Sequence, residues 1–196
     1  VQCVASMTFY VTVAGGGVAP IALVGGTSAA PTNVYARRLA GGVISVRKDG
    51  VGSGAGFGGT STDAIAAFAS GAVVLSEANL LRRFSPGDGV EKTIANLDGI
   101  YSTVSGDGYN TQFPGIIESI FPINDSSIVF TAGNQIWAGF GPFTADVTVD
   151  PDAFMFYRIG GAADNAFGTA MGDGDAVRFA KASAIVVDES SGYLYI

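Results

Sequence analysis

A glycine-rich turn that ends in phenylalanine occurs three times in this chain of 196 residues. The copies are DGVGSGAGF (49–57), SGDGYNTQF (105–113) and MGDGDAVRF (171–179), and a strand-like segment precedes each of them. Phe57, Phe113 and Phe179 are 56 and 66 residues apart, and an apolar strand, a tight turn and a second apolar strand follow each one. A repeat of this size with several strands predicts the blades of a β-propeller, with the surplus over about 40–50 residues in loops.

The rest of the chain also consists of short β-rich runs between glycine turns, which predicts an all-β fold. No segment keeps a helical apolar period over three turns, although 61–70 (STDAIAAFAS) is the best candidate for a helix, with Ser61 or Thr62 as its cap. That segment is short and Gly71 follows it, so we predict a strand there as well. The predicted strands cover 7–13, 19–24, 33–40, 64–69, 72–77, 79–85, 90–96, 115–123, 126–132, 135–140, 153–160, 182–188 and 193–196.

The N-terminal stretch contains no charged residue before Arg37, and 9–26 is long enough to cross a bilayer. Three consecutive glycines at 15–17 and Pro20 disfavour a helix there, because each glycine lowers helix propensity and proline removes a hydrogen bond. We therefore predict two buried strands, with a membrane helix or the remains of a targeting segment as alternatives. The missing initiator methionine suggests a processed or partial chain.

Composition excludes several classes of function. The net charge is −7 and the isoelectric point is about 4.3, so nucleic acid is a poor partner. The chain has no histidine, which excludes histidine-based triads and histidine-ligated zinc within it. Its single cysteine, Cys3, permits neither an intrachain disulfide nor a CxxC metal site. Apolar residues make up 48% and charged residues 14%, which favours a folded chain over a disordered one.

The last repeat resembles the NHL repeat, whose pattern is a GDG-type turn, a phenylalanine and an "I-x-V-D-x-x-G-x-L-Y-V" strand pair. The middle repeat keeps Gly106, Asp107, Gly108 and Phe113 but has Asn124-Asp125 at the hairpin turn, and the first keeps Phe57. The resemblance implies a propeller, usually of about six blades, without fixing a function. The matching residues of the last repeat are Gly172, Asp173, Gly174, Phe179, Ile185, Val187, Asp188, Gly192, Leu194, Tyr195 and Ile196.

The repeat boundaries predict an incomplete propeller. We expect the last three strands of one blade in 1–42, whole blades in 43–98 and 99–160, and the first two strands of another in 161–196. These amount to about three blade equivalents, fewer than the roughly 4–8 that close a ring. We therefore expect either a piece of a longer protein or a chain whose open edges pair with another chain.

Candidate ligand sites are few. Asp107, Asp173 and Asp175 lie in the glycine turns and are candidate ligands for a cation such as calcium. The spacing of a dedicated calcium loop is absent, so caps for their own turns are the favoured role, and no cofactor is predicted. The repeated phenylalanines are predicted to be core residues between blades rather than a ligand platform.

Other polar groups have structural interpretations. The acidic groups Asp146/Asp150/Asp152 and Asp188/Glu189 contain no spacing that singles out an acid–base pair, which favours acidic surface. For Arg37-Arg38 and Arg82-Arg83, we predict that one arginine of each doublet points outward and the other toward a neighbouring blade, in a structural ion pair. Asn124-Asp125-Ser126 is an N-glycosylation sequon at a predicted hairpin turn.

Two hypotheses of function remain. The first is a non-catalytic module for protein interaction or structure, extracellular or at the cell surface. It would bind protein partners or copies of itself in a larger assembly or filament, with any membrane anchor outside this segment. The alternative is a metal-dependent propeller enzyme, similar to the amidating lyase among NHL proteins or to related lactonases, with its catalytic residues largely outside this segment. RNA binding, also found among NHL proteins, is disfavoured by the acidic charge.

Overall fold

The fold is all-β, as predicted. The computed structural model describes residues 7–12, 18–24, 33–36, 46–58, 63–87, 89–144, 146, 148–188 and 190–196. These residues form antiparallel sheets and three single-turn 3-10 helices, with no α-helix among them. Within the same residues, no helix has the length and apolar character needed to cross a membrane.

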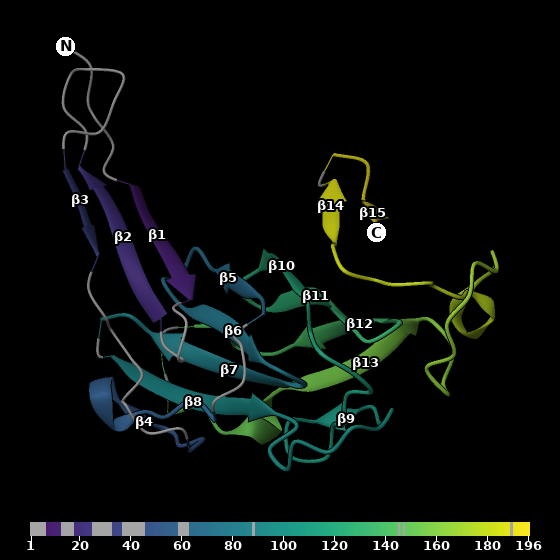
Figure 1. The fold of residues 1–196 in the computed structure, drawn as a ribbon, viewed down its shortest axis with the longest axis horizontal. Helices are drawn as coiled ribbons and strands as arrows, with labels where there is room; N and C mark the ends of the chain where they lie inside the picture. Colours follow the sequence, from purple (N-terminus) through teal and green to yellow (C-terminus); the bar gives the residue numbers. More distant parts are fainter. Residues whose placement is uncertain are drawn as a thin grey trace.

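Two five-stranded sheets with the same topology form the centre of the molecule (Figure 1). In each sheet four consecutive strands form a meander, and a short strand from before the meander pairs with its last strand. Sheet I has the order β4-β8-β7-β6-β5, and sheet II has the order β9-β13-β12-β11-β10. Sheet I consists of β4 (Gly50–Val51), β5 (Ile65–Ala67), β6 (Val73–Glu77), β7 (Leu80–Ser85) and β8 (Val90–Ala95). Sheet II consists of β9 (Gly106–Asp107), β10 (Ser119–Asn124), β11 (Ser127–Ala132), β12 (Gln135–Phe140) and β13 (Met155–Gly160).

The repetition extends to the central hairpin of each sheet. Ala78 and Gly133 both adopt the left-handed conformation in these turns, with φ of 53° and 59°. The next residue is asparagine in both, and its side-chain amide donates to a backbone carbonyl beyond the last strand of its own sheet. Asn79 Nδ2 donates to the carbonyl of Ile100 at 3.0 Å, and Asn134 Nδ2 donates to that of Asn165 at 3.1 Å. The same residue type therefore fastens the same turn in both sheets.

Sheets I and II pack face to face on a common hydrophobic core. Phe113 lies at its centre, with its ring edge-on to Phe130, Trp137 and Phe156 at centroid distances of 5.2, 5.1 and 5.8 Å. Sheet I contributes smaller side chains to the same core, and burying these apolar surfaces drives the stacking of the two sheets. The principal sheet I members are Ala66, Val74, Leu81, Ile94 and Ala95.

The opposite face of each sheet is also covered. A second cluster on sheet I contains Phe57, Val73, Leu75 and Phe84. A third cluster on sheet II joins Val129, Ile136 and Ala138 to Phe179, Ala182 and Ile185 of the C-terminal segment. The three repeated phenylalanines therefore belong to three successive layers. Phe57 and Phe113 are fully buried, as predicted for core residues, whereas Phe179 is half-buried.

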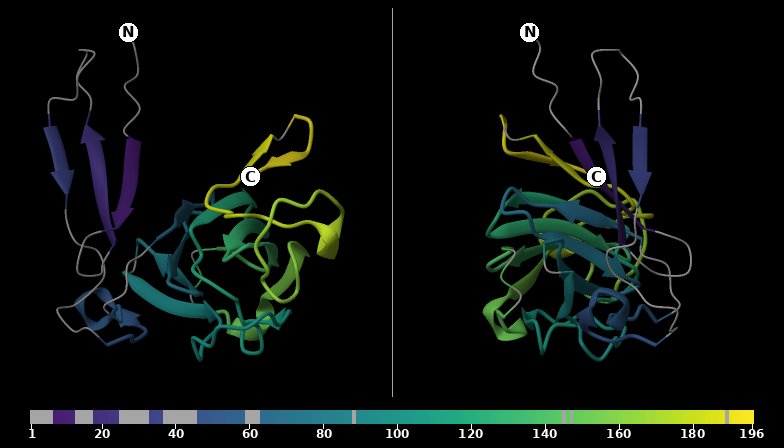
Figure 2. Two further views of the ribbon diagram at one scale, coloured as in Figure 1. Left: turned by 45° about the vertical axis from the view of Figure 1, so that its right-hand side comes forward. Right: turned by 90° about the vertical axis from the view of Figure 1, so that its left-hand side faces the viewer.

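Two smaller sheets flank this stack. β1 (Met7–Thr12), β2 (Val18–Val24) and β3 (Asn33–Ala36) form a three-stranded antiparallel sheet, and β14 (Val186–Asp188) and β15 (Tyr193–Tyr195) form a hairpin. Both project from the same side of the molecule, at opposite ends of the stack (Figure 2). β1 and β2 confirm the two strands predicted in the N-terminal stretch. The alternative of a membrane helix over 9–26 is wrong for 9–12 and 18–24, the part of this range that the structure describes.

Most predicted strands are confirmed with shifts of one or two residues at their ends. β5 confirms the strand prediction within 61–70, where a helix was the alternative. The strand predicted over 182–188 begins only at Val186, because Ala182 and Ile185 pack their side chains onto sheet II without joining a ladder. The ranges 43–98 and 99–160 each contain one five-stranded sheet, and the described sheets do not close into a ring.

Candidate functional site

The acidic glycine turns do not come together as a cation site. Asp107 accepts hydrogen bonds from the backbone and side-chain nitrogens of Asn110 at 2.8–2.9 Å, so it caps its own turn. Asp175 pairs with Arg158, whose hydrogen bond and positive charge lower the pKa of that carboxyl group. Asp173 is exposed at the start of the neighbouring 3-10 turn. In the described part of the chain, no group of three or more acidic or cysteine side chains is arranged to hold a metal ion.

The glycines of the repeat have structural roles in their turns. At Gly108 a β-carbon would lie 2.1 Å from the carbonyl oxygen of Ile94, so only glycine lets the turn lie against sheet I. Gly192 has a φ of 72°, and its amide donates to the carbonyl of Asp188 at 2.8 Å. The Asp188 side chain accepts from Ser190 and Ser191 in the same turn, and these hydrogen bonds lower its pKa to about 2. The glycines and Asp188 of the repeat motif therefore stabilise the backbone conformation of their turns.

Among the described acidic residues of these groups, none is paired with another carboxyl group as an acid with its base. Asp146 accepts from the backbone amide and hydroxyl of Thr148, which lowers the pKa of its carboxyl group. Asp150 forms an ion pair with Lys92 at 2.8 Å, and Asp152 is exposed in the following 3-10 turn. Glu189 lies outside the described residues. These contacts agree with the interpretation of acidic surface.

The glycosylation sequon lies beside a cavity between the two central sheets. The side chain of Asn124 is exposed at the turn from β10 to β11, and its Oδ1 accepts from the backbone amide of Ser126 at 2.8 Å. Glycosylation there stays a prediction, which the intact mass of protein secreted from a eukaryotic host would test.

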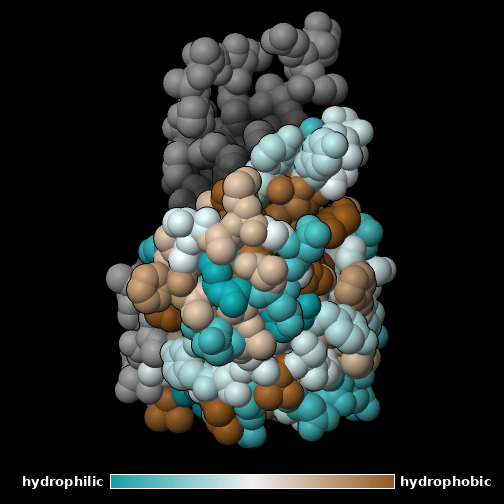
Figure 3. Space-filling model, turned by 90° about the vertical axis from the view of Figure 1, so that its right-hand side faces the viewer, coloured by the Kyte–Doolittle hydropathy of each residue, from teal (hydrophilic) through white to brown (hydrophobic). Residues whose placement is uncertain are grey.

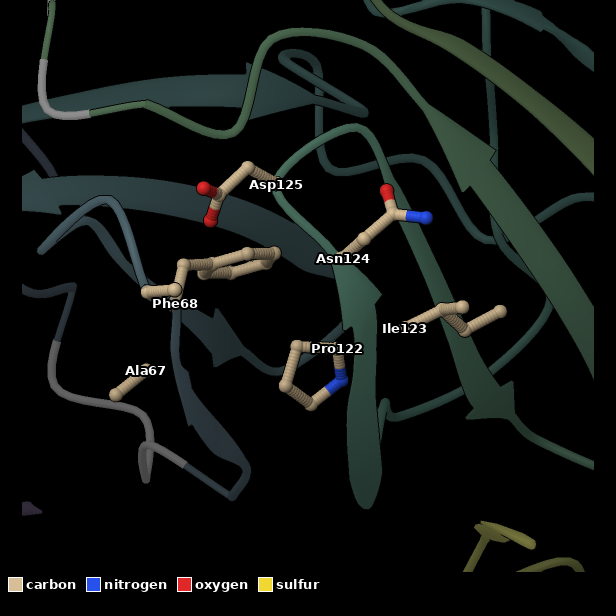
Figure 4. A pocket seen from close by; sticks show the side chains of 7 residues that line it. Ala67, Phe68, Pro122, Ile123, Asn124 and Asp125 are labelled. Atoms are coloured by element: carbon tan, nitrogen blue, oxygen red, sulfur yellow. The ribbon is translucent and has the colours of Figure 1, made fainter. Parts of the chain in front are cut away.

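The neighbouring Asp125 accepts a hydrogen bond from the backbone amide of Ser70, which ties the two sheets together. The cavity measures about 390 Å³ and is lined by Ala67, Phe68, Ala69, Pro122, Ile123, Asn124 and Asp125 (Figure 4).

Arg82 is the centre of a buried ionic cluster. The sequence pointed to the arginine but not to its carboxylate partners. Its guanidinium lies 2.9 Å from Glu77, 3.2 Å from Asp49 and 3.3 Å from Glu91. It also donates to the backbone carbonyls of Lys48 and Gly56, and it lies 4.9 Å from the centroid of the Phe57 ring. Arg82, Glu77 and Glu91 are fully buried. The predicted structural ion pair is therefore confirmed for this arginine, but its partners lie in or beside its own sheet rather than in a neighbouring blade.

The predicted outward orientation of one arginine in the doublet is wrong. Arg83 is also fully buried, because both faces of β7 are covered. It lies over the Phe154 ring at 5.5 Å and donates to the carbonyl of Pro142 at 3.0 Å, so it binds the two sheets together. Burial lowers the pKa of its guanidinium. The other doublet, Arg37-Arg38, lies outside the described residues.

Burial raises the pKa of Glu91 to about 8 against the opposing effect of Arg82, so this carboxyl group is protonated in the folded protein at neutral pH. Between about pH 4.5 and 8 the folded chain then holds a proton that the unfolded chain has lost, and stability falls as pH rises through this range.

We expect Glu91→Gln to remove this component, which is limited to roughly 1.4 kcal/mol per pH unit for one proton. Urea unfolding at several pH values between 5 and 8 measures the slope. Glu118→Gln, at a carboxylate side chain that is 33% exposed and pairs with Lys181, serves as the control. An unchanged slope in Glu91→Gln would show that Glu91 titrates normally.

An apolar row on the outer face of sheet II is exposed. Met155, Tyr157 and Ile159 alternate with the buried Phe156 along β13, and Phe140 lies opposite Met155 on β12. Their exposed fractions are 36%, 45%, 47% and 48% in the order Met155, Tyr157, Ile159 and Phe140. We call these four residues the open face. Figure 3 looks onto this end of the molecule, where brown apolar residues are interspersed with teal polar ones.

The hairpin beside the open face carries apolar side chains on both of its sides, together with Asp188 on the outer side. Val187 and Leu194 face sheet II and pack against its outer cluster. Val186, Tyr193 and Tyr195 lie on the opposite side and are 50%, 67% and 55% exposed. The hairpin therefore covers part of sheet II and presents a new apolar surface.

The comparisons with known proteins leave the family open. No protein-family model matches the chain, and no curated protein is significantly similar to it in sequence.

Proposed function

We propose that this chain is a non-catalytic module for protein interaction or structure that associates through the open face and the hairpin. The single observation that carries the proposal is the contrast between the faces of the two central sheets. Three faces are covered by buried clusters, whereas one half of the fourth exposes Phe140, Met155, Tyr157 and Ile159. An apolar sheet face gains free energy when another apolar surface covers it.

We further propose that the sheets are propeller-type blades similar to those of NHL proteins. Support comes from the shared topology of sheets I and II, from the matching Asn79 and Asn134 turns, and from one repeated phenylalanine in each layer. The proposed setting is extracellular or at a cell surface, within a larger assembly. The exposed sequon at Asn124 and the low content of charged residues support that setting.

The test compares two aspartate substitutions at isoleucines of equal exposure. Ile159 on the open face and Ile100 beyond β8 are 47% and 48% exposed. We expect the unmodified chain to elute well above its 19.8 kDa mass in size exclusion with light scattering. Ile159→Asp shifts it toward the monomer, because a charge buried at the contact costs free energy, and Ile100→Asp leaves it unchanged. Identical elution of both variants and the unmodified chain would overturn the proposal.

A further inference from the structure

A polar hollow lies where the loop after sheet I meets the loop after sheet II. It measures about 350 Å³ and is lined by residues 101–103 and 163–165 together with Pro114. Sites for small molecules range from about 300 to 1,000 Å³, so the hollow is large enough to hold a ligand. The cavity beside Pro122 has mainly apolar walls, whereas the walls of this hollow are mainly polar. A ligand that fits here is therefore polar as well.

Several polar groups of the wall are held in place and still have hydrogen-bonding capacity. Asn165 Oδ1 accepts from the backbone amide of Asn134 at 2.8 Å, and Asp164 Oδ1 accepts from that of Ala166 at 3.0 Å. In the described part of the chain, no protein group bonds to Asn165 Nδ2, to Asp164 Oδ2 or to the Ser102 hydroxyl. The wall thus offers both donors and acceptors to a ligand.

A fully buried side chain supports this wall from behind. Gln135 Nε2 donates to the Thr103 hydroxyl at 3.1 Å and to the carbonyl of Ala162 at 2.5 Å. Its Oε1 accepts from the indole nitrogen of Trp137 at 3.1 Å. Gln135 therefore joins the two loops that form the hollow and connects them to the aromatic core. Side chains that are fixed by a second layer of hydrogen bonds are typical of a preorganised binding site.

The aromatic ring of Tyr101 and the mixture of polar groups indicate the class of ligand. Tyr101 is 58% exposed and lines the same hollow, so its ring is accessible. An aromatic ring packs against the apolar C–H face of a sugar ring, and sugar hydroxyl groups both donate and accept hydrogen bonds. An ammonium ion has donors only and would leave Asn165 Nδ2 without an acceptor. An anion would be repelled by Asp164, the charged side chain among the described residues of the wall.

We propose that this hollow binds a neutral saccharide, which stacks on Tyr101 and forms hydrogen bonds with Asp164 and Asn165. The hollow shares no residue with the open face, so this site goes beyond the association proposed above and does not depend on it. Binding at both places would let the chain hold a saccharide while it associates with a protein partner.

The test is a titration of the full-length chain with a fixed panel of neutral sugars: glucose, galactose, mannose, N-acetylglucosamine, maltose and lactose. Saturation-transfer NMR detects contact between sugar and protein. The fluorescence of Trp137, the only tryptophan of the chain, reports changes at Thr103 through Gln135. Tyr101→Ala removes the stacking ring, and Tyr109→Ala, at a tyrosine that is 51% exposed and lies outside the wall, is the matched control. Each variant is first shown to keep the thermal transition of the unmodified chain.

We expect at least one sugar of the panel to bind and to shift the emission of Trp137. Tyr101→Ala should raise its dissociation constant about tenfold or more, because the aromatic contact is lost, and Tyr109→Ala should leave it unchanged. Asp164→Asn should also weaken binding, since the amide keeps the cap on the Ala166 amide but loses the charged acceptor. No binding by any sugar of the panel, or binding of ethylammonium alone, would overturn the inference. Sugar binding that leaves Trp137 unchanged, or that both tyrosine variants weaken equally, would place the site elsewhere and overturn it as well.

Discussion

Replacing Arg82 with methionine is expected to lower the free energy of unfolding by about 3–5 kcal/mol, the range for breaking a buried ion pair from one side. The guanidinium holds Glu77 and Asp49 at 2.9 and 3.2 Å and satisfies the carbonyls of Lys48 and Gly56. Methionine fills much of the volume but donates no hydrogen bond, so each of these acceptors loses one of its donors. Urea unfolding with an unchanged m-value measures the loss.

Lys181→Met is the matched control for a charged side chain. Lys181 pairs with Glu118 at 3.2 Å on the surface, and its side chain is 67% exposed, so its loss should cost less than about 1 kcal/mol. Adding Glu77→Gln to Arg82→Met should recover part of the stability, because the amide removes a buried charge that has lost the nearer of two arginine partners, Arg47 lying at 3.5 Å. A loss for Arg82→Met as small as that for Lys181→Met would contradict the role assigned to the cluster.

Phe113→Ala is expected to destabilise the fold by about 3–5 kcal/mol, the range for removing a large ring from a core. The Phe113 ring lies edge-on to three other aromatic rings in the core that joins sheets I and II. Its loss leaves a cavity among rigid rings that cannot collapse to fill it. Thermal or urea unfolding measures the effect, and Phe167→Ala, at a ring 78% exposed, should change stability by less than about 0.5 kcal/mol. Equal effects at the two positions would show that Phe113 does not stabilise the core between sheets I and II.

The strands were predictable because local sequence encodes them. Short runs of β-branched and aromatic residues between glycines give strand positions directly, and the spacing of Phe57 and Phe113 gives the repeat. Asn79 and Asn134 each lie two residues after the end of a strand, β6 and β11 respectively. Their equivalence is recognised only from the topology, which gives β6 and β11 the same place in the two sheets.

The environment of the arginine doublet was not predictable in the same way. Alternation along β7 places Arg82 and Arg83 on opposite faces, but it does not show that both faces are covered. The partners of Arg82 come from distant segments, with Asp49 lying 33 residues earlier. Such coverage depends on the stacking of whole sheets, which no local pattern encodes.

The open face corresponds to an unusually apolar strand sequence, whose meaning becomes clear from the structure. The run MFYRI on β13 is apolar at nearly every position, which is the pattern of a strand covered on both sides. The structure covers Phe156 on one side and exposes Met155, Tyr157 and Ile159 on the other. A strand with the composition of a buried one and a face in solvent is the physical basis for the proposed association.

Amide hydrogen exchange of the unmodified chain at increasing concentration tests the association most directly. We expect the amides of β15 (Tyr193–Tyr195) and of β13 (Met155–Gly160) to become more protected as concentration rises, while those of the buried strand β6 (Val73–Glu77) stay unchanged. Ile159→Asp should abolish the change. Protection at β15 and β13 that is the same at every concentration would contradict the claim that this molecule associates through its open sheet face.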